Sequence, residues 1–129
     1  MHTYKYEFSY RKLNVYQWSM SLVKEVYALL KLYPQHEQYA KCDQMRRSAV
    51  SVPSNIAEGT SKTSPKEQFH FLEIAYGSLM ELMCQIEISL DLSYISDEQF
   101  ASLKRKYLLY IKCCLLCKRH YVRVFKMFK

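Results

Sequence analysis

Apolar residues recur every three or four positions through most of the chain, and the longest run lies between Phe69 and Leu90. This spacing keeps the side chains on one face of an α-helix, which has 3.6 residues per turn. The run has seven positions without a break: Phe69, Leu72, Tyr76, Leu79, Met83, Ile86 and Leu90. A helix this long and one-sided buries its apolar face against other helices, so the run predicts a helical bundle.

Three further segments carry the same pattern, and short connections separate all four. The predicted helices cover about residues 14–33, 37–58, 65–92 and 97–127, after an N-terminal extension of residues 1–12. Because short connections join antiparallel neighbours, the fold class predicted for the single domain 1–129 is all-α. Its architecture is an antiparallel up-down-up-down four-helix bundle.

Polar residues at the starts of three predicted helices have the pattern of N-terminal caps. Ser64 precedes Pro65 and lies three residues before Glu67, which is a capping box with proline at the first helical position. The same spacing recurs at the starts of the last and first helices, in the pairs Ser96/Gln99 and Asn14/Gln17. We expect these residues to fix where the helices begin.

The second predicted helix contains a proline inside its apolar face, which consists of Cys42, Met45, Ala49, Val52 and Ile56. Pro53 lacks the backbone N–H that would bond the carbonyl of Ala49, at a cost of about 3 kcal/mol. The helix therefore either ends at Pro53 or bends there. Because the face continues toward Gly59, a residue suited to a left-handed C-terminal cap, we expect a Pro-kinked helix. Asn55 then either satisfies a freed carbonyl or faces a neighbouring helix.

Two predicted helices carry more apolar residues than one bundle core needs, which is about three per heptad. On the first helix the predicted core face is Leu13, Tyr16, Met20, Val23, Tyr27 and Leu30. The surplus on the first and last helices is Trp18, Leu22, Val26, Leu29, Leu108, Leu109, Ile111, Leu115 and Leu116. The surplus indicates either a wide core or a second buried face, and we favour the second face and hence self-association.

The net charge of +7 comes from the last quarter of the chain. Residues 1–96 hold ten bases and ten acids, whereas residues 97–129 hold nine bases and two acids. On the last predicted helix, bases recur every seven residues opposite the core face; this basic row is Arg105, Lys112, Arg119 and Lys126. Arg123 lies beside the row.

The basic row predicts a surface for a polyanion. Charged helix faces are usually just solvated, but charges of one sign along a helix repel one another, and a polyanion relieves that repulsion. Contacts to phosphates give salt-dependent binding with weak sequence preference. RNA is favoured over DNA, and we expect Arg46 and Arg47 to extend the surface. The alternative is an acidic protein partner.

Patterns for a metal or catalytic site are weak. Glu67 and His70 form an E-x-x-H pair of the kind found in di-iron bundles, but no second pair exists and both residues point away from the predicted core. A second cluster has zinc-like spacing: Cys113, Cys114, Cys117 and His120. Two of its cysteines lie on the core face, where cysteine acts as a small apolar residue. The sequence thus predicts no enzyme, cofactor or metal, with a cysteine-based metal or redox sensor as an alternative.

Several absences in the sequence favour a cytoplasmic protein. No stretch of about 18 apolar residues lacks charge, which argues against a membrane span. The N-terminal sequence MHTYKYEFSYRK has no apolar segment of the secretory type. The odd number of cysteines, five, does not suggest a disulfide framework.

Two segments resemble a known bacterial family: YRKLNVYQWSMSLVKEVYALLKLYP and MRRSAVSVPSNIAEGTSKTSPKEQFHFLEIAYGSLMELMCQIEI. The second contains the block RRxAVSxPxNIAEG, followed by Phe-Leu-x-x-Ala-x-Gly-Ser-Leu-x-Glu-Leu. Over about residues 10–95 the chain resembles the four-helix-bundle family of proteins encoded in 23S rRNA intervening sequences. The resemblance implies an antiparallel bundle that assembles as a homopentamer, with no known enzymatic activity.

Related bundles are accessory subunits of the reverse transcriptases of diversity-generating retroelements, in which a basic pentamer binds the polymerase and RNA. No residue signature for that role occurs here. We therefore predict a non-enzymatic, oligomeric bundle, with Pro53, Asn55 and Gly59 shaping its second helix. RNA would contact Arg105, Lys112, Arg119, Arg123 and Lys126. The alternative is a protein-interaction scaffold, for example a reverse-transcriptase accessory subunit, whose basic helix meets a protein partner.

Overall fold

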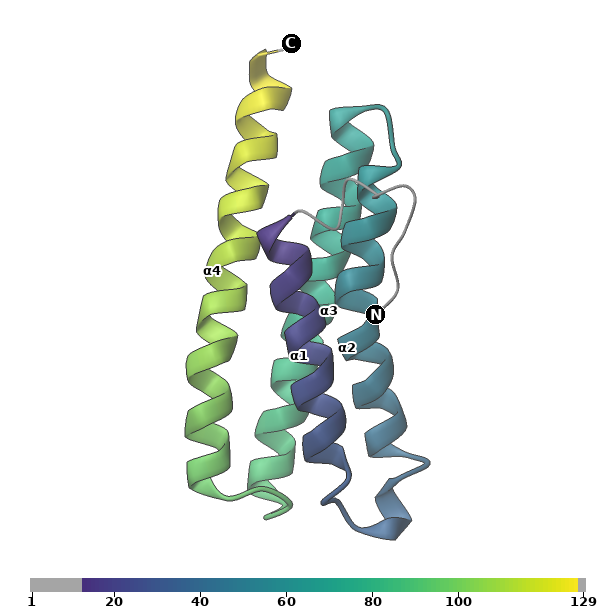
Figure 1. Cartoon of the computed structure of the whole chain (residues 1–129), viewed down its shortest axis with the longest axis vertical. Coiled ribbons are helices and arrows are strands. Elements are labelled where there is room, and N and C mark those ends of the chain that lie inside the picture. Colours follow the sequence, from purple (N-terminus) through teal and green to yellow (C-terminus); the bar gives the residue numbers. More distant parts are fainter. Residues whose placement is uncertain (1–12, 128–129) are drawn as a thin grey trace, which may run out of the picture.

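The computed structural model describes residues 13–127, with side chains in the last part of α4 described only in part, and shows four α-helices packed side by side (Figure 1). They are α1 (Asn14–Leu30), α2 (Lys41–Thr60), α3 (Pro65–Asp91) and α4 (Asp97–Met127). Consecutive helices run in opposite directions, and α1 and α3 each contact both α2 and α4. The predicted all-α four-helix bundle is confirmed. No helix within the described residues is long and apolar enough to cross a membrane.

The core face of α2 agrees with the predicted residues, and the described buried residues of α4 have the helical spacing of a core face. On α2 all five residues of the predicted face are at most 5% exposed. On α4 the described side chains that are buried are those of Leu103, Tyr107, Tyr110 and Cys114. On α2 the spacing was sufficient because this helix has only one apolar stripe with helical spacing.

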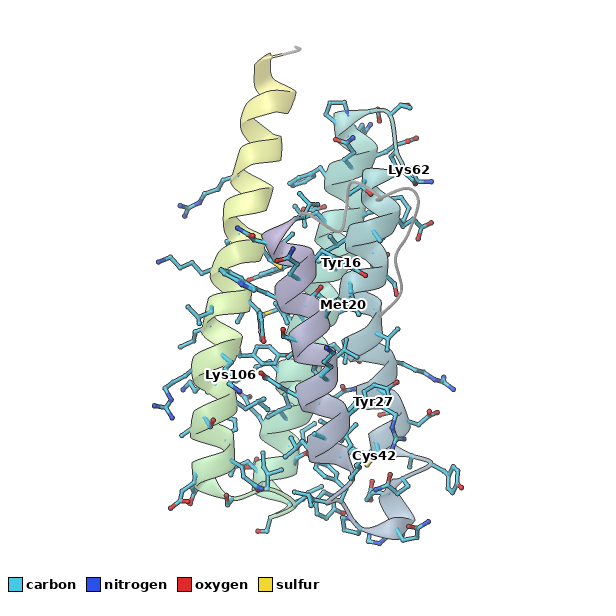
Figure 2. All side chains as sticks on the ribbon, in the orientation of Figure 1. Tyr16, Met20, Tyr27, Cys42, Lys62 and Lys106 are labelled. Atoms are coloured by element: carbon cyan, nitrogen blue, oxygen red, sulfur yellow. The ribbon has the colours of Figure 1, made fainter. Side chains whose placement is uncertain are left out.

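The core face predicted for α1 is wrong except at Leu30. Its buried residues are Val15, Ser19, Leu22, Val26 and Leu30, whereas Leu13, Met20 and Tyr27 are about two-fifths exposed. Both sets have three-and-four spacing, so periodicity alone cannot choose between them. The structure buries the set with smaller side chains and leaves the long Met20 and Tyr27 at the edge of the contact with α2 (Figure 2).

Two of the three predicted N-terminal caps are present. The Oγ of Ser64 accepts a hydrogen bond from the N–H of Glu67 at 3.1 Å. Ser96 and Gln99 form a reciprocal capping box, with bonds of 2.9 and 3.1 Å. The cap predicted at Asn14 is wrong, because α1 begins after Leu13 without a side-chain cap and Asn14 is already helical.

The second helix begins at Lys41 rather than near Glu37, since residues Gln35–Glu37 form the short 3-10 helix η2. The side-chain amide of Gln38 donates to the carbonyls of Leu30 and Tyr33 at 2.9 and 3.2 Å. These bonds satisfy backbone groups at the end of α1. Because this turn occupies the residues after α1, α2 begins later in the sequence than predicted.

Pro53 is buried inside α2, so the helix does not end there; a bend at this position stays a prediction. The side-chain amide of Asn55 donates to the carbonyl of Ser51 at 2.8 Å and to its Oγ at 2.9 Å. That Oγ lies 2.8 Å from the Oγ of Ser78 on α3. Asn55 therefore bonds a carbonyl other than that of Ala49 and connects through Ser51 to the neighbouring helix.

Gly59 does not form the predicted left-handed cap. The helix continues to Thr60, and neither glycine of the chain has a positive φ. A Cβ at Gly59 would lie 3.1 Å from the Cβ of Phe71. The glycine instead allows a close approach between α2 and α3.

Candidate nucleic-acid interface

The described part of the basic row lies on the outer face of α4. Arg105, Lys112 and Arg119 are exposed, and the buried residues of α4 lie on the opposite side of the helix. Seven residues correspond to about 10 Å along a helix, so each side chain can reach a different phosphate. Arg123 and Lys126 belong to α4, but their side chains lie outside the described residues. The C-terminal part of α4 extends past the start of α1 (Figure 1).

The charges of the basic row are not neutralised by ion pairs within the described part of the chain. The ion pair on α4 instead joins the Nζ of Lys106 to Oε1 of Glu25 on α1, at 3.0 Å (Figure 2). Lys106 lies on the flank of α4 that faces α1, whereas the row points away from both neighbouring helices. The row therefore keeps its positive charge toward solvent.

Leucines flank the basic row on both sides. Leu108, Leu109 and Leu115 are 55%, 58% and 38% exposed. They belong to the surplus found in the sequence, and their exposure shows that this part of the surplus does not widen the core. The outer face of α4 is consequently both basic and apolar.

Arg46 and Arg47 do not extend the basic row, because α2 lies diagonally across the bundle from α4. The guanidinium of Arg46 donates to the backbone carbonyl of Gln38 at 3.2 Å and to its side-chain oxygen at 2.7 Å. It also lies 5.9 Å from the centre of the Tyr27 ring. Arg47 pairs with Asp43 at 3.1 Å. Arg46 thus holds the connection between α1 and α2.

The metal-binding candidates whose side chains the structure describes do not form a cluster. Glu67 and His70 are exposed, and Cys114 is buried in the core. The side chains of Cys113, Cys117 and His120 lie outside the described residues. Where side chains are described, no three His, Cys, Asp or Glu residues come close enough to hold a metal ion.

Two buried tyrosines of α4 belong to its packing against the other helices, and one of them bonds directly to α3. Tyr107 is fully buried, and its hydroxyl donates to the carbonyl of Leu79 at 2.8 Å. Burial raises the pKa of Tyr107 well above its usual value. Burial, together with the negative charge of Glu25, raises the pKa of Tyr110 to about 12. Both groups stay protonated at neutral pH.

The fold defines an antiparallel four-helix-bundle protein whose most distinctive surface is the basic outer face of α4. Residues 11–113 match the family of 23S rRNA-intervening sequence proteins, and the chain belongs to this family. The match ends before Arg119, so the family pattern covers only part of the basic row.

The fold is also similar to a crystal structure from Bacteroides thetaiotaomicron, of a protein of unknown function from the S23 ribosomal protein family. The TM-score is 0.74 at 22% sequence identity, over 81% of this chain and 97% of that one. At this identity the similarity shows the fold alone. A comparison with curated proteins found no match.

Proposed function

We propose that the chain is a non-enzymatic, oligomeric scaffold of the cytoplasm that binds RNA through the basic row. The observation that carries the proposal is the exposure of Arg105, Lys112 and Arg119 at seven-residue intervals, without ion pairs inside the described chain. The family name, which refers to 23S rRNA, supports an RNA context. The proposed assembled form is a homopentamer, as the resemblance implies.

Binding would depend on phosphate contacts and the release of counterions. Each contact contributes about 0.7–0.9 to the slope of log affinity against log salt concentration. Three described bases therefore account for a slope of about 2 to 3. Since Arg105, Lys112 and Arg119 are exposed, binding needs no rearrangement of the bundle to reach them.

The test is a salt series with a structured RNA, using wild type and a variant with Arg105→Gln, Lys112→Gln and Arg119→Gln. The variant should bind more weakly, with a slope smaller by about 2 to 3. A control with Lys24→Gln, Lys31→Gln and Lys66→Gln removes the same charge from exposed sites elsewhere. If the row variant and the control keep the same slope, the row is not the binding site.

A second candidate function is a protein-interaction scaffold, for example a reverse-transcriptase accessory subunit. The observation that favours it is the exposure of Leu108 and Leu109 beside the row, because apolar side chains add little to phosphate binding but add much to a protein interface. Absence of RNA binding at low salt from a folded, assembled protein would favour this function over the first.

A further inference from the structure

The outer face of α3 has the charge opposite to that of α4. Ile74, Glu81 and Ile88 follow one another at seven-residue intervals, and the two isoleucines are 38% and 42% exposed. Glu73 and Glu87 flank them and are exposed as well. We call these five residues the acidic face of α3.

The corresponding basic face of α4 consists of Arg105, Leu108, Leu109, Lys112 and Leu115, all of them exposed. Each face thus combines exposed branched aliphatic residues with charges of a single sign. Such a combination is typical of a surface that contacts another protein surface of opposite charge.

The two faces cannot satisfy each other within one chain. The helices α3 and α4 are neighbours in the bundle (Figure 1), but their outer faces both point to solvent. Of the ion pairs between described side chains, none includes Glu81, Glu87, Arg105 or Lys112. Glu81 and Glu87 on one face and Arg105 and Lys112 on the other therefore carry charges that no described ion pair uses in the single chain.

We propose that the basic face of α4 docks on the acidic face of α3 in a second copy of this chain. The proposal rests on the oligomeric part of the proposed function and names the surfaces that meet. Charge complementarity and the exposed aliphatic residues on both faces single out another copy as the occupant, because the chain itself carries the matching face.

The hydrogen bond between Tyr107 and the carbonyl of Leu79 gives the relative heights of the two helices, since it places these residues about level along the bundle. Because α3 and α4 are antiparallel, Arg105 is then about level with Glu81, and Lys112 with Ile74. Rotation about an axis parallel to the helices keeps every copy at one height. It therefore brings Arg105 of one copy opposite Glu81 of the next and Lys112 beside Glu73.

The same alignment brings Leu109 about level with Gly77, which lies on the outer side of α3. Gly77 is exposed, and a Cβ added there would meet nothing within 4 Å. A glycine inside an exposed helical segment lowers helix stability relative to alanine. Here its missing side chain leaves space for a leucine from the docked copy.

Because the two faces differ, the contact is heterologous and each copy offers both halves of it. Repetition of such a contact closes into a ring when the rotation permits. Docking covers Arg105 and Lys112, so a second copy and RNA compete for these two bases. The salt slope of about 2 to 3 therefore applies to the single chain, and the assembled form offers RNA the basic row from Arg119 onward.

The test measures the mass of the full chain in solution for three charge-reversal variants. Arg105→Glu with Lys112→Glu reverses the basic face, and Glu73→Lys with Glu81→Lys reverses the acidic face. Each pair alone should lower the mass to that of one chain, 15.5 kDa. The variant with all four changes should recover the mass of the wild type, because the two faces are again complementary.

The control variant, Lys24→Glu with Lys31→Glu, makes the same charge change on the exposed side of α1 and should keep the wild-type mass. Circular dichroism reports whether each variant keeps its helices. A variant that loses them is replaced by Leu109→Ser with Ile88→Ser, which should also yield single chains.

An assembled wild type whose mass is unchanged in both reversed pairs would overturn the docking proposal, as would a fourfold variant that remains a single chain. A wild type that is a single chain at micromolar concentration would overturn docking together with the oligomeric part of the proposed function. RNA affinity is measured separately on the same samples. Loss of mass in the reversed pairs supports docking whether or not RNA binds.

Discussion

Replacing Tyr107 by phenylalanine tests the account of the contact between α3 and α4. At neutral pH the variant loses the hydrogen bond to the carbonyl of Leu79, and buried hydrogen bonds contribute about 1 kcal/mol to the free energy of unfolding. We therefore expect the variant to be less stable at pH 7 by about 1 kcal/mol.

The difference should reverse at alkaline pH. Burial raises the pKa of Tyr107 in the folded chain above the value of 10.0 in the unfolded chain. The stabilisation is complete below pH 10 and falls as the pH rises further, because only the unfolded chain releases the proton. By pH 11 the wild type has lost about 1.4 kcal/mol through Tyr107, a loss that the phenylalanine variant does not have.

The assay is urea unfolding, followed by circular dichroism, at several values between pH 7 and pH 11. Tyr39→Phe is the matched control, since Tyr39 is 89% exposed and should leave stability unchanged across this range. The two stability curves of wild type and Tyr107→Phe should cross near pH 11. Parallel curves would show that Tyr107 is not a buried, protonated group in the folded chain.

Four further substitutions test individual backbone and side-chain contacts. Ser93 has φ 61° between α3 and α4, and Ser93→Gly should raise the unfolding free energy by about 1 kcal/mol, measured in urea. Gly59→Ala should lower the thermal midpoint despite better helix propensity, because the new Cβ would lie 3.1 Å from that of Phe71; a raised midpoint would contradict the close approach. Arg46→Gln should lower the free energy of unfolding by about 1–2 kcal/mol and leave the salt slope of RNA binding unchanged. Arg47→Gln should change the free energy of unfolding and the salt slope only slightly. Urea unfolding measures the first quantity, and the RNA titration measures the second.

The sequence predicted those elements whose apolar pattern has a single solution. On α2 one stripe has helical spacing, and that stripe is the core. On α1 two stripes overlap, and the choice between Leu22 and Met20 depends on the neighbouring helices rather than on spacing. Packing against other elements, which no local pattern encodes, decides such cases.

The candidate site shows the same division. The exposure of Arg105, Lys112 and Arg119 followed from their position opposite the core of one helix. The separation of Arg46 from that row could not be predicted from the sequence, because it depends on which helices lie diagonally in the bundle. The seven-residue spacing of Ile74, Glu81 and Ile88 was present in the sequence and could have indicated the acidic face.

The hydrogen bonds that link Asn55, Ser51 and Ser78 help to determine the register of α2 against α3. Apolar stripes with regular spacing pack almost as well after one helix slides by a turn past its neighbour. Such a slide would separate the two hydroxyls, which lie 2.8 Å apart at the half-buried contact of α2 with α3. Each polar group left without a partner would cost about 1–3 kcal/mol. This small polar cluster therefore selects one register of α2 against α3 and disfavours every shifted one.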